Sequence, residues 1–177
     1  MSEKLSIIEL GNPILRQKAE FVKDIQDKTI QKLIDDLLVT VKETNGVGIA
    51  APQVAVGYRI FIVASRPNFR YPNAPLMEPT AMINPRILNY SDDIVKGWEG
   101  CLSIPGIRGL VPRYREIEVE YTDRYGQLQK QELTDFVARI FQHEYDHFEG
   151  LVFLDRVETT FDIVTEQEYQ NLIINQL

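Results

Sequence analysis

The stretch Gln142-His143-Glu144-Tyr145-Asp146-His147 says most about both the fold and the chemistry of this chain. It contains both histidines of the sequence, four positions apart, with a glutamate directly after the first. Residues at i and i+4 lie on one face of a helix, where two imidazoles can hold one metal ion. Glu144 would reach a water molecule on that ion without being a ligand itself. The stretch therefore predicts a metal-binding helix.

The residues around this stretch predict where the helix begins and ends. Thr134 or Asp135 is the expected start, Phe148 the approximate end, and Gly150 the stop signal. The helix has an apolar face just before the histidines, made of Phe136, Val137, Ile140 and Phe141. Because such a face is normally buried, the pattern argues against two histidines on a solvated helix surface.

The segments before this helix have mainly strand patterns. Alternating polar and apolar residues predict a hairpin of two strands, 116–121 and 127–133. A buried strand is expected at 59–64 and a short one at 81–85, with an irregular proline-rich loop at 66–81 between them. The strands do not alternate with helices along the chain. The sequence therefore predicts the α+β class, with mixed or antiparallel sheets.

Two further helices are expected, one near each end of the chain. The first covers about 27–44, where apolar residues recur at helical spacing and Asp27 is the N-cap. The last covers about 166–176, and Thr165 to Glu168 form a capping box at its start. With 177 residues and no linker or repeat, we expect residues 1–177 to form a single catalytic domain.

Composition excludes several classes of protein. Hydrophobic residues make up 44% of the chain, enough for a packed core, and no apolar run approaches the ~18 residues of a membrane span. The net charge of -7 argues against direct nucleic-acid binding and against an anionic membrane as a partner. The single cysteine, Cys101, excludes an intrachain disulfide, and we expect a reducing compartment, the cytoplasm.

A catalytic metal site usually has three protein ligands, and the two histidines leave one to be found. One candidate is Cys101, in the run Glu99-Gly100-Cys101-Leu102-Ser103, whose thiol would lose its proton on binding a cation. The other is Glu166, downstream of His147, although the capping box already gives that residue a structural reason to be there. The residue pattern leaves both candidates open.

Three motifs together make the chain resemble a peptide deformylase. They are Gly46-Val47-Gly48-Ile49-Ala50-Ala51-Pro52-Gln53, the run from Glu99 to Ser103, and the stretch from Gln142 to His147 followed by Gly150. Their order and separation also match that family, and Gly11 to Arg16 is similar to its N-terminal segment. The resemblance therefore extends over nearly the whole chain.

The resemblance implies removal of the N-formyl group from the N-terminal formyl-methionine of newly synthesised polypeptides, with release of formate. It implies that sheets enclose the motif helix, and that Cys101, His143 and His147 hold one divalent metal ion. That ion would be Fe2+ in the cell, with Zn2+, Ni2+ or Co2+ as replacements in purified protein. The expected partners are an N-formylmethionyl peptide and the nascent chain at the ribosome.

The resemblance also implies roles for individual residues. Glu144 would take a proton from the attacking water, and the Gln53 amide and the Leu102 backbone N–H would stabilise the charge that develops on the formyl oxygen. Apart from the resemblance, a methionine side chain needs an apolar pocket, and the residues that we expect to bind the substrate are Val47, Gly48, Glu99, Gly100, Arg108, Phe136 and Ile140. Asp146, again apart from the resemblance, is expected to orient the helix or to pair with an arginine such as Arg113, or else to be a solvated helix charge.

Three other interpretations remain open at this point. One is an endopeptidase that uses Glu166 as its third metal ligand. Another is a non-enzymatic module that binds peptides or metal without turnover, although Gln53, Cys101 and Glu144 are all in place. The last is a structural zinc site, which would need a fourth ligand that the sequence does not obviously offer.

Overall fold

The structure is a computed structural model that describes residues 2–174. Three α-helices are present in this range: α1 (Lys28–Glu43), α2 (Asp135–Phe148) and α3 (Glu166–Ile174). The strands are β1 (Gly48–Ala50), β2 (Ile60–Val63), β3 (Thr80–Tyr90), β4 (Ile94–Cys101), β5 (Ile104–Tyr114), β6 (Glu116–Thr122), β7 (Leu128–Thr134) and β8 (Ile163–Thr165). Short 3-10 helices are η1 (Pro13–Arg16), η2 (Ala51–Val54), η3 (Phe153–Arg156) and η4 (Thr160–Asp162).

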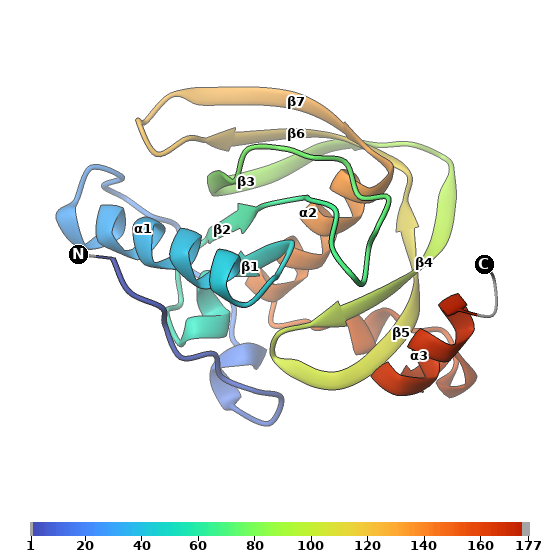
Figure 1. The fold of residues 1–177 in the computed structure, drawn as a ribbon. Coiled ribbons are helices and arrows are strands. Elements are labelled where there is room, and N and C mark those ends of the chain that lie inside the picture. The colour runs from blue at the N-terminus through green and yellow to red at the C-terminus, as the bar shows by residue number, and fades with distance from the viewer. Residues whose placement is uncertain (1, 175–177) are drawn as a thin grey trace.

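The strands form two sheets, and every strand pair within them is antiparallel. One sheet has five strands in the order β1-β2-β3-β6-β7, and the other has three in the order β4-β5-β8. Figure 1 shows α2 running between the larger sheet and the long β4–β5 hairpin. The helix contacts strands of both sheets, among them β1, β2 and β5. The expected α+β class with antiparallel sheets is thus confirmed.

The apolar face of α2 packs into the main core of the protein. Phe141 meets the Phe61 ring edge-on at 5.1 Å between ring centroids, and Phe148 stacks on Phe61 at 5.2 Å. All three rings are fully or almost fully buried. Burial of a phenylalanine side chain contributes roughly 1.5–3 kcal/mol, so this triplet anchors the helix on β2.

Helix α1 covers the other side of the larger sheet. Asp27 is its N-cap, and the carboxylate accepts a hydrogen bond from the N–H of Thr29. The buried stripe of the helix includes Ile34 and Leu37, which pack with Ile60 and other residues of β1, β2 and β3. This is the helix that the 27–44 pattern predicts.

The sequence and the structure differ most in the strands. The hairpin of β6 and β7 is confirmed, but the short strand expected at 81–85 is wrong in length, because β3 runs from Thr80 to Tyr90. Pro85, which lacks a backbone N–H, stands where the pairing with β6 shifts register between Ile83 and Arg86. The bulge removes the need for that donor and lets the strand continue.

The end of the chain agrees with expectation as far as it is described. Helix α3 starts at Glu166, and the hydroxyl of Thr165 accepts a hydrogen bond from the N–H of Glu168. Its expected end at residue 176 lies outside the described residues. Among residues 2–174, no helix combines the length and the apolar character that a membrane span requires.

Candidate active site

Helix α2 turns its polar motif toward the protein interior. His143, Glu144 and His147 are only 9%, 4% and 0% exposed. The helix starts at Asp135, whose backbone is left-handed (φ 48°). Both the backbone and the side chain of Asp135 form hydrogen bonds with Arg115. The Arg115 carbonyl accepts from the Asp135 N–H at 2.7 Å, and its Nε donates to the Asp135 carboxylate at 2.9 Å. The start of the helix is thereby tied to the loop between β5 and β6.

Cys101 brings a sulfur atom to the two imidazoles. It is the last residue of β4, at a register irregularity in the β4–β5 pairing. One ligand atom each from Cys101, His143 and His147 lies within 4.8 Å of the others, and Cys101 Sγ is 3.5 Å from His147 Nε2. Burial, and then the charge of His143, lower the pKa of His147 well below its usual value, which favours the neutral ring that a metal needs.

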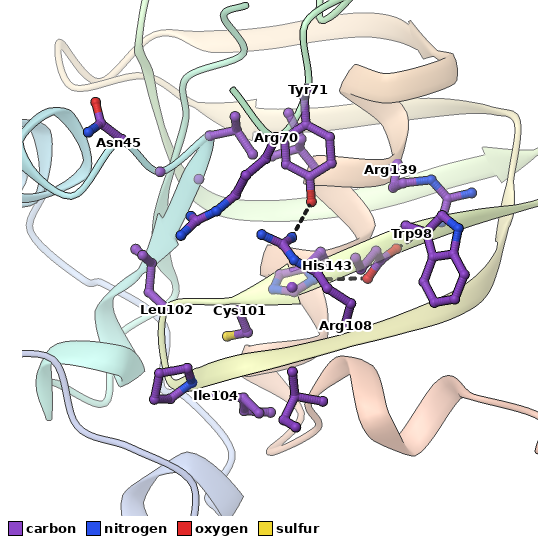
Figure 2. Close-up of a pocket in the computed structure, with 18 of the residues that line it drawn as sticks. Asn45, Arg70, Tyr71, Trp98, Cys101, Leu102, Ile104, Arg108, Arg139 and His143 are labelled. Atoms are coloured by element: carbon purple, nitrogen blue, oxygen red, sulfur yellow. Dashed lines mark hydrogen bonds and ion pairs between the residues drawn. The ribbon is translucent and has the colours of Figure 1, made fainter. Parts of the chain in front are cut away.

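The cluster fits a divalent metal ion by the chemistry of its donors. A thiolate and two imidazoles suit zinc, iron, cobalt or nickel. His143 makes its contact with Glu99 through Nδ1, at 2.9 Å, which leaves Nε2 for a ligand. Figure 2 shows His143 and Cys101 in the same pocket.

Glu99 belongs to a buried network of charges behind His143. Its carboxylate accepts hydrogen bonds from Arg113 at 2.9 and 3.0 Å and from Arg139 at 2.9 Å. Burial alone would raise the pKa of Glu99, but the charge of Arg113 and the hydrogen bond with His143 hold it well below its usual value. Glu99 is therefore an anion that orients His143.

Asp146 closes this network on the other side of Arg113. It accepts from Arg113 Nη1 at 2.6 Å and from Arg156 Nη2 at 2.7 Å, and it is 5% exposed. The expected pairing of Asp146 with Arg113 is confirmed, and a solvated helix charge is excluded. The two arginines connect α2 to β5 and η3, so the ion pairs help to set the position of the motif helix.

Glu144 is the buried acid beside the cluster. Its Oε2 atom has no hydrogen-bond partner among residues 2–174. Burial is the main reason that its pKa is raised to about 7, and the charge of His143 opposes this rise. A buried carboxylate with a free oxygen and a pKa near neutrality can both accept and release a proton.

Gly48 makes room for that acid. A Cβ built at Gly48 would lie 2.9 Å from Glu144 Cδ, closer than side chains normally approach. Gly48 was predicted from the sequence to contact the substrate. In the structure, Glu144 occupies the space beside it. Any larger residue at position 48 would have to displace the carboxylate.

Gln53 has its amide group oriented by the backbone. The Ala50 N–H donates to Gln53 Oε1 at 2.8 Å, which assigns the other end of the amide as the nitrogen. That nitrogen donates to Cys101 Sγ at 3.3 Å and to Ser103 Oγ at 3.2 Å. The Gln53 N–H groups thus point at the cluster from η2, far from α2 in the sequence.

A cavity of about 200 Å³ opens over these groups. The predicted site residues that line it are Val47, Gly48, Gln53, Glu99, Gly100, Cys101, Leu102, Arg108, Phe136, Ile140, His143 and Glu144. His147 is not in the lining and lies behind, fully buried. Leu102 belongs to the turn that connects β4 to β5.

Part of the cavity lining was not predicted from the sequence. Arg70 and Tyr71 come from the proline-rich loop, and Trp98 and Arg139 come from β4 and α2. No local pattern distinguishes these residues from ordinary loop or core residues. Glu166 also lines the cavity, but it pairs with Arg108 at 2.6 Å rather than joining the group of Cys101, His143 and His147. The geometry therefore favours Cys101 over Glu166 as the third ligand.

Comparisons with known proteins point to one family. A sequence profile described as polypeptide deformylase matches residues 4–161. Peptide deformylase 2 of Nostoc sp. is 70% identical over 171 residues, 97% of this chain and 96% of that protein. Peptide deformylase 2 of Shewanella oneidensis is 46% identical over 167 residues, 94% of this chain and 92% of that protein.

Solved structures share the fold. A Met-Ala-Ser-bound class I type b peptide deformylase from Acinetobacter baumannii has a TM-score of 0.87 and 43% identity, covering 89% of this chain and 100% of that one. The peptide deformylase of Thermotoga maritima has a TM-score of 0.79 and 34% identity, covering 88% of this chain and 99% of that one.

The fold, the site and these similarities define the class of the protein as a metal-dependent hydrolase of linear amides. The chain belongs to the peptide deformylase family. The reaction of that family is removal of the N-formyl group from the N-terminal formyl-methionine of newly synthesised polypeptides, with release of formate.

Proposed function

We propose that deformylation in this chain is carried out by Glu144 beside one divalent metal ion held by Cys101, His143 and His147. The observation that carries the proposal is a group of three ligand atoms within 4.8 Å of one another, next to a buried carboxylate with an unpaired oxygen. When bound, the metal supplies Lewis acidity and lowers the pKa of water. Fe2+ is our proposal for the cell, and Zn2+, Ni2+ or Co2+ suit the same donors.

Glu144 acts as the proton carrier. It accepts a proton from the attacking water and then delivers it to the nitrogen of the leaving amine. A pKa near neutrality suits both steps, because the group must bind the proton and let it go in one cycle.

Gln53 and Leu102 stabilise the transition state. As the formyl carbon becomes tetrahedral, negative charge grows on its oxygen, and donors already in place stabilise it without reorganising. The Gln53 amide is preorganised by its bond to the Ala50 N–H. The Leu102 backbone N–H is the second donor in this proposal, from the turn beside Cys101.

The cavity receives the formyl-methionyl end of the peptide. Val47, Phe136 and Ile140 offer apolar surface for a methionine side chain. The other proposed substrate-binding residues are Gly48, Glu99, Gly100 and Arg108. The Acinetobacter baumannii structure with Met-Ala-Ser supports peptide binding in this fold.

The proposal also covers the domain organisation, the location and the partners of the protein. We propose a single catalytic domain over residues 1–177, in which the His-Glu-x-x-His helix is the central, metal-binding element of the fold. The protein would act in the cytoplasm on the nascent chain at the ribosome, where formylated N-termini first become accessible. We propose no direct contact with nucleic acid, given the net charge of -7.

The test is formate release from formyl-Met-Ala-Ser by anaerobically purified protein, with bound metal measured on every sample. The parent should release formate, and Glu144→Ala should release none while keeping its metal. Glu132→Ala removes an exposed glutamate of β7 and should behave like the parent. A parent fully loaded with iron or nickel that releases no formate would overturn the proposal.

A further inference from the structure

Glu166 lines the active-site cavity from a part of the chain that the family profile does not reach. The profile ends at residue 161, and Glu166 is the first residue of α3. The residue is not a member of the metal-ligand group. Its role therefore has to be sought in its own contacts.

Those contacts lead to Arg108. The Arg108 Nε donates to Glu166 Oε2 at 2.6 Å, and its Nη1 donates to the Tyr71 hydroxyl at 2.9 Å. Figure 2 shows Arg108 reaching across the cavity toward Tyr71. The Arg108 side chain is 4% exposed, and the Glu166 side chain is 23% exposed. The guanidinium is thus held between α3 and the proline-rich loop.

Two aromatic rings and a glycine complete the surroundings of the Arg108 guanidinium. Arg108 Cζ lies 5.2 Å from the Tyr169 ring centroid and 5.7 Å from the Tyr71 ring centroid, within cation–π range. A Cβ at Gly100 would lie 2.6 Å from Arg108 Cζ, so a larger residue there would displace the guanidinium from this position. The Tyr71 ring in turn packs on Phe136 at 4.8 Å.

We propose that Glu166 is a positioning residue for substrate binding, which holds Arg108 against Tyr71 so that the two form one wall of the peptide cavity. This inference rests on the proposed function of the cavity. It gives the C-terminal helix a role in the reaction, because Glu166 and Tyr169 both belong to α3.

The residues that shape the peptide cavity are held by different contacts from the residues proposed to act on the reacting atoms. Arg108, Tyr71 and Glu166 shape the cavity, whereas His143 is held by Glu99, and Gln53 by Ala50. Loss of Glu166 leaves a buried cation with one partner fewer, and Arg108 then adopts other orientations or draws in water. Substrate binding should weaken, while the groups that touch the reacting atoms keep their places.

The experiment compares Glu166→Gln with the matched control Glu168→Gln, an exposed acid on the same helix. Steady-state formate release from formyl-Met-Ala-Ser and metal content are measured on each purified protein. Glu166→Gln should raise KM about threefold to tenfold, with kcat and metal content unchanged, because the glutamine oxygen can still accept from Arg108 but lacks the charge that strengthens the bond. Glu166→Asp should recover part of the loss, and Glu168→Gln should match the parent.

A second variant removes the other hydrogen bond of the Arg108 guanidinium, the one to Tyr71. Tyr71→Phe keeps the ring and removes the hydroxyl that accepts from Arg108, so KM should rise again. The double variant with Glu166→Gln should show less than the product of the two effects, because both act on Arg108. Because Tyr71 lies outside α3, the single variant Tyr71→Phe tests the role of Arg108 even if Glu166→Gln disturbs the helix.

The inference is overturned if Glu166→Gln matches the parent, lowers kcat at constant KM, or loses the metal. The last result would instead support Glu166 as a metal ligand. A parent that releases no formate would point to failure of the proposed function, which is a separate outcome from an active parent with an indifferent Glu166.

Discussion

Glu99 Oε2 lies 2.9 Å from Nδ1 of His143, and both side chains are buried. This contact connects the metal-binding motif on α2 to β4, which also carries Cys101 two residues further on. A carboxylate in this position fixes the orientation of the imidazole and raises its basicity as a ligand.

Replacing Glu99 should therefore weaken metal binding. In Glu99→Gln the anion between Arg113 and His143 is lost, and removal of such a supporting group typically costs 10- to 100-fold in metal affinity, so we expect about that loss. Competition with a chelator, followed by metal analysis, measures it. Glu132→Gln, an exposed change on β7, is the control. Unchanged metal affinity in Glu99→Gln would contradict the orienting role.

Gly48→Ala should lower activity by moving Glu144. The new Cβ would lie 2.9 Å from Glu144 Cδ, so the carboxylate has to shift. A displacement of about 1 Å can cost on the order of 10²-fold in rate, and we expect kcat/KM to fall by about that factor. Gly57→Ala is the matched control, because nothing lies within 4 Å of a Cβ at that position. Equal activity of both variants would show that Glu144 tolerates displacement.

Gln53→Glu isolates the donor function of the amide. The carboxylate still accepts from the Ala50 N–H, but it cannot donate to the cluster as Gln53 Nε2 does. If that donor stabilises the developing charge, kcat should fall by on the order of 10²-fold with little change in KM. Gln131→Glu makes the same replacement on an exposed position of β7. A change in KM alone, or no effect, would contradict the proposal that Gln53 stabilises the transition state.

The contacts of Asp36, a buried residue of α1, should make the stability of the fold depend on pH. It accepts from Lys32 Nζ at 2.6 Å and from the Glu3 N–H at 3.0 Å. Burial raises the pKa of Asp36, but the hydrogen bond from Lys32 and the one from Glu3 outweigh it, so the pKa lies below the usual 3.8. A lowered folded-state pKa means that the stabilisation is complete above the unfolded pKa. It is lost as pH falls through the folded value.

Urea unfolding of Asp36→Asn tests this sign. The variant should unfold at a lower urea concentration than the parent near about pH 7, and the gap should narrow as pH falls below the usual aspartate pKa. Asp92→Asn, which changes an exposed aspartate, is the control. A gap that widens toward low pH would show that Asp36 does not stabilise the fold as an anion.

Elements with a strong local pattern were predictable from the sequence. Helix α1 has an apolar stripe and an N-cap at Asp27, and the β6–β7 hairpin has clean alternation around a turn. In both cases the decisive interactions join residues that are close in the sequence. Local propensity and tertiary packing therefore point the same way.

The long β4–β5 hairpin was not predicted, for a physical reason. Its strands contain glycines and prolines that local propensity places outside sheets. In the folded protein two of these glycines make room for buried arginines: a Cβ at Gly97 would lie 2.7 Å from Arg139 Cζ, and one at Gly100 would lie 2.6 Å from Arg108 Cζ. Contacts with residues distant in the sequence thus account for positions that look like strand breakers.

The sequence by itself determined the motif helix and its pair of imidazoles, because i and i+4 spacing is a local property of a helix. It left Cys101 and Glu166 as rival third ligands. Tertiary structure decided which of them lies beside the imidazoles, since the end of β4 brings Cys101 Sγ to 3.5 Å from His147 Nε2, while Arg108 holds Glu166 on the cavity wall. That choice depends on which distant segments pack against α2, and spacing along the chain carries no information about such packing.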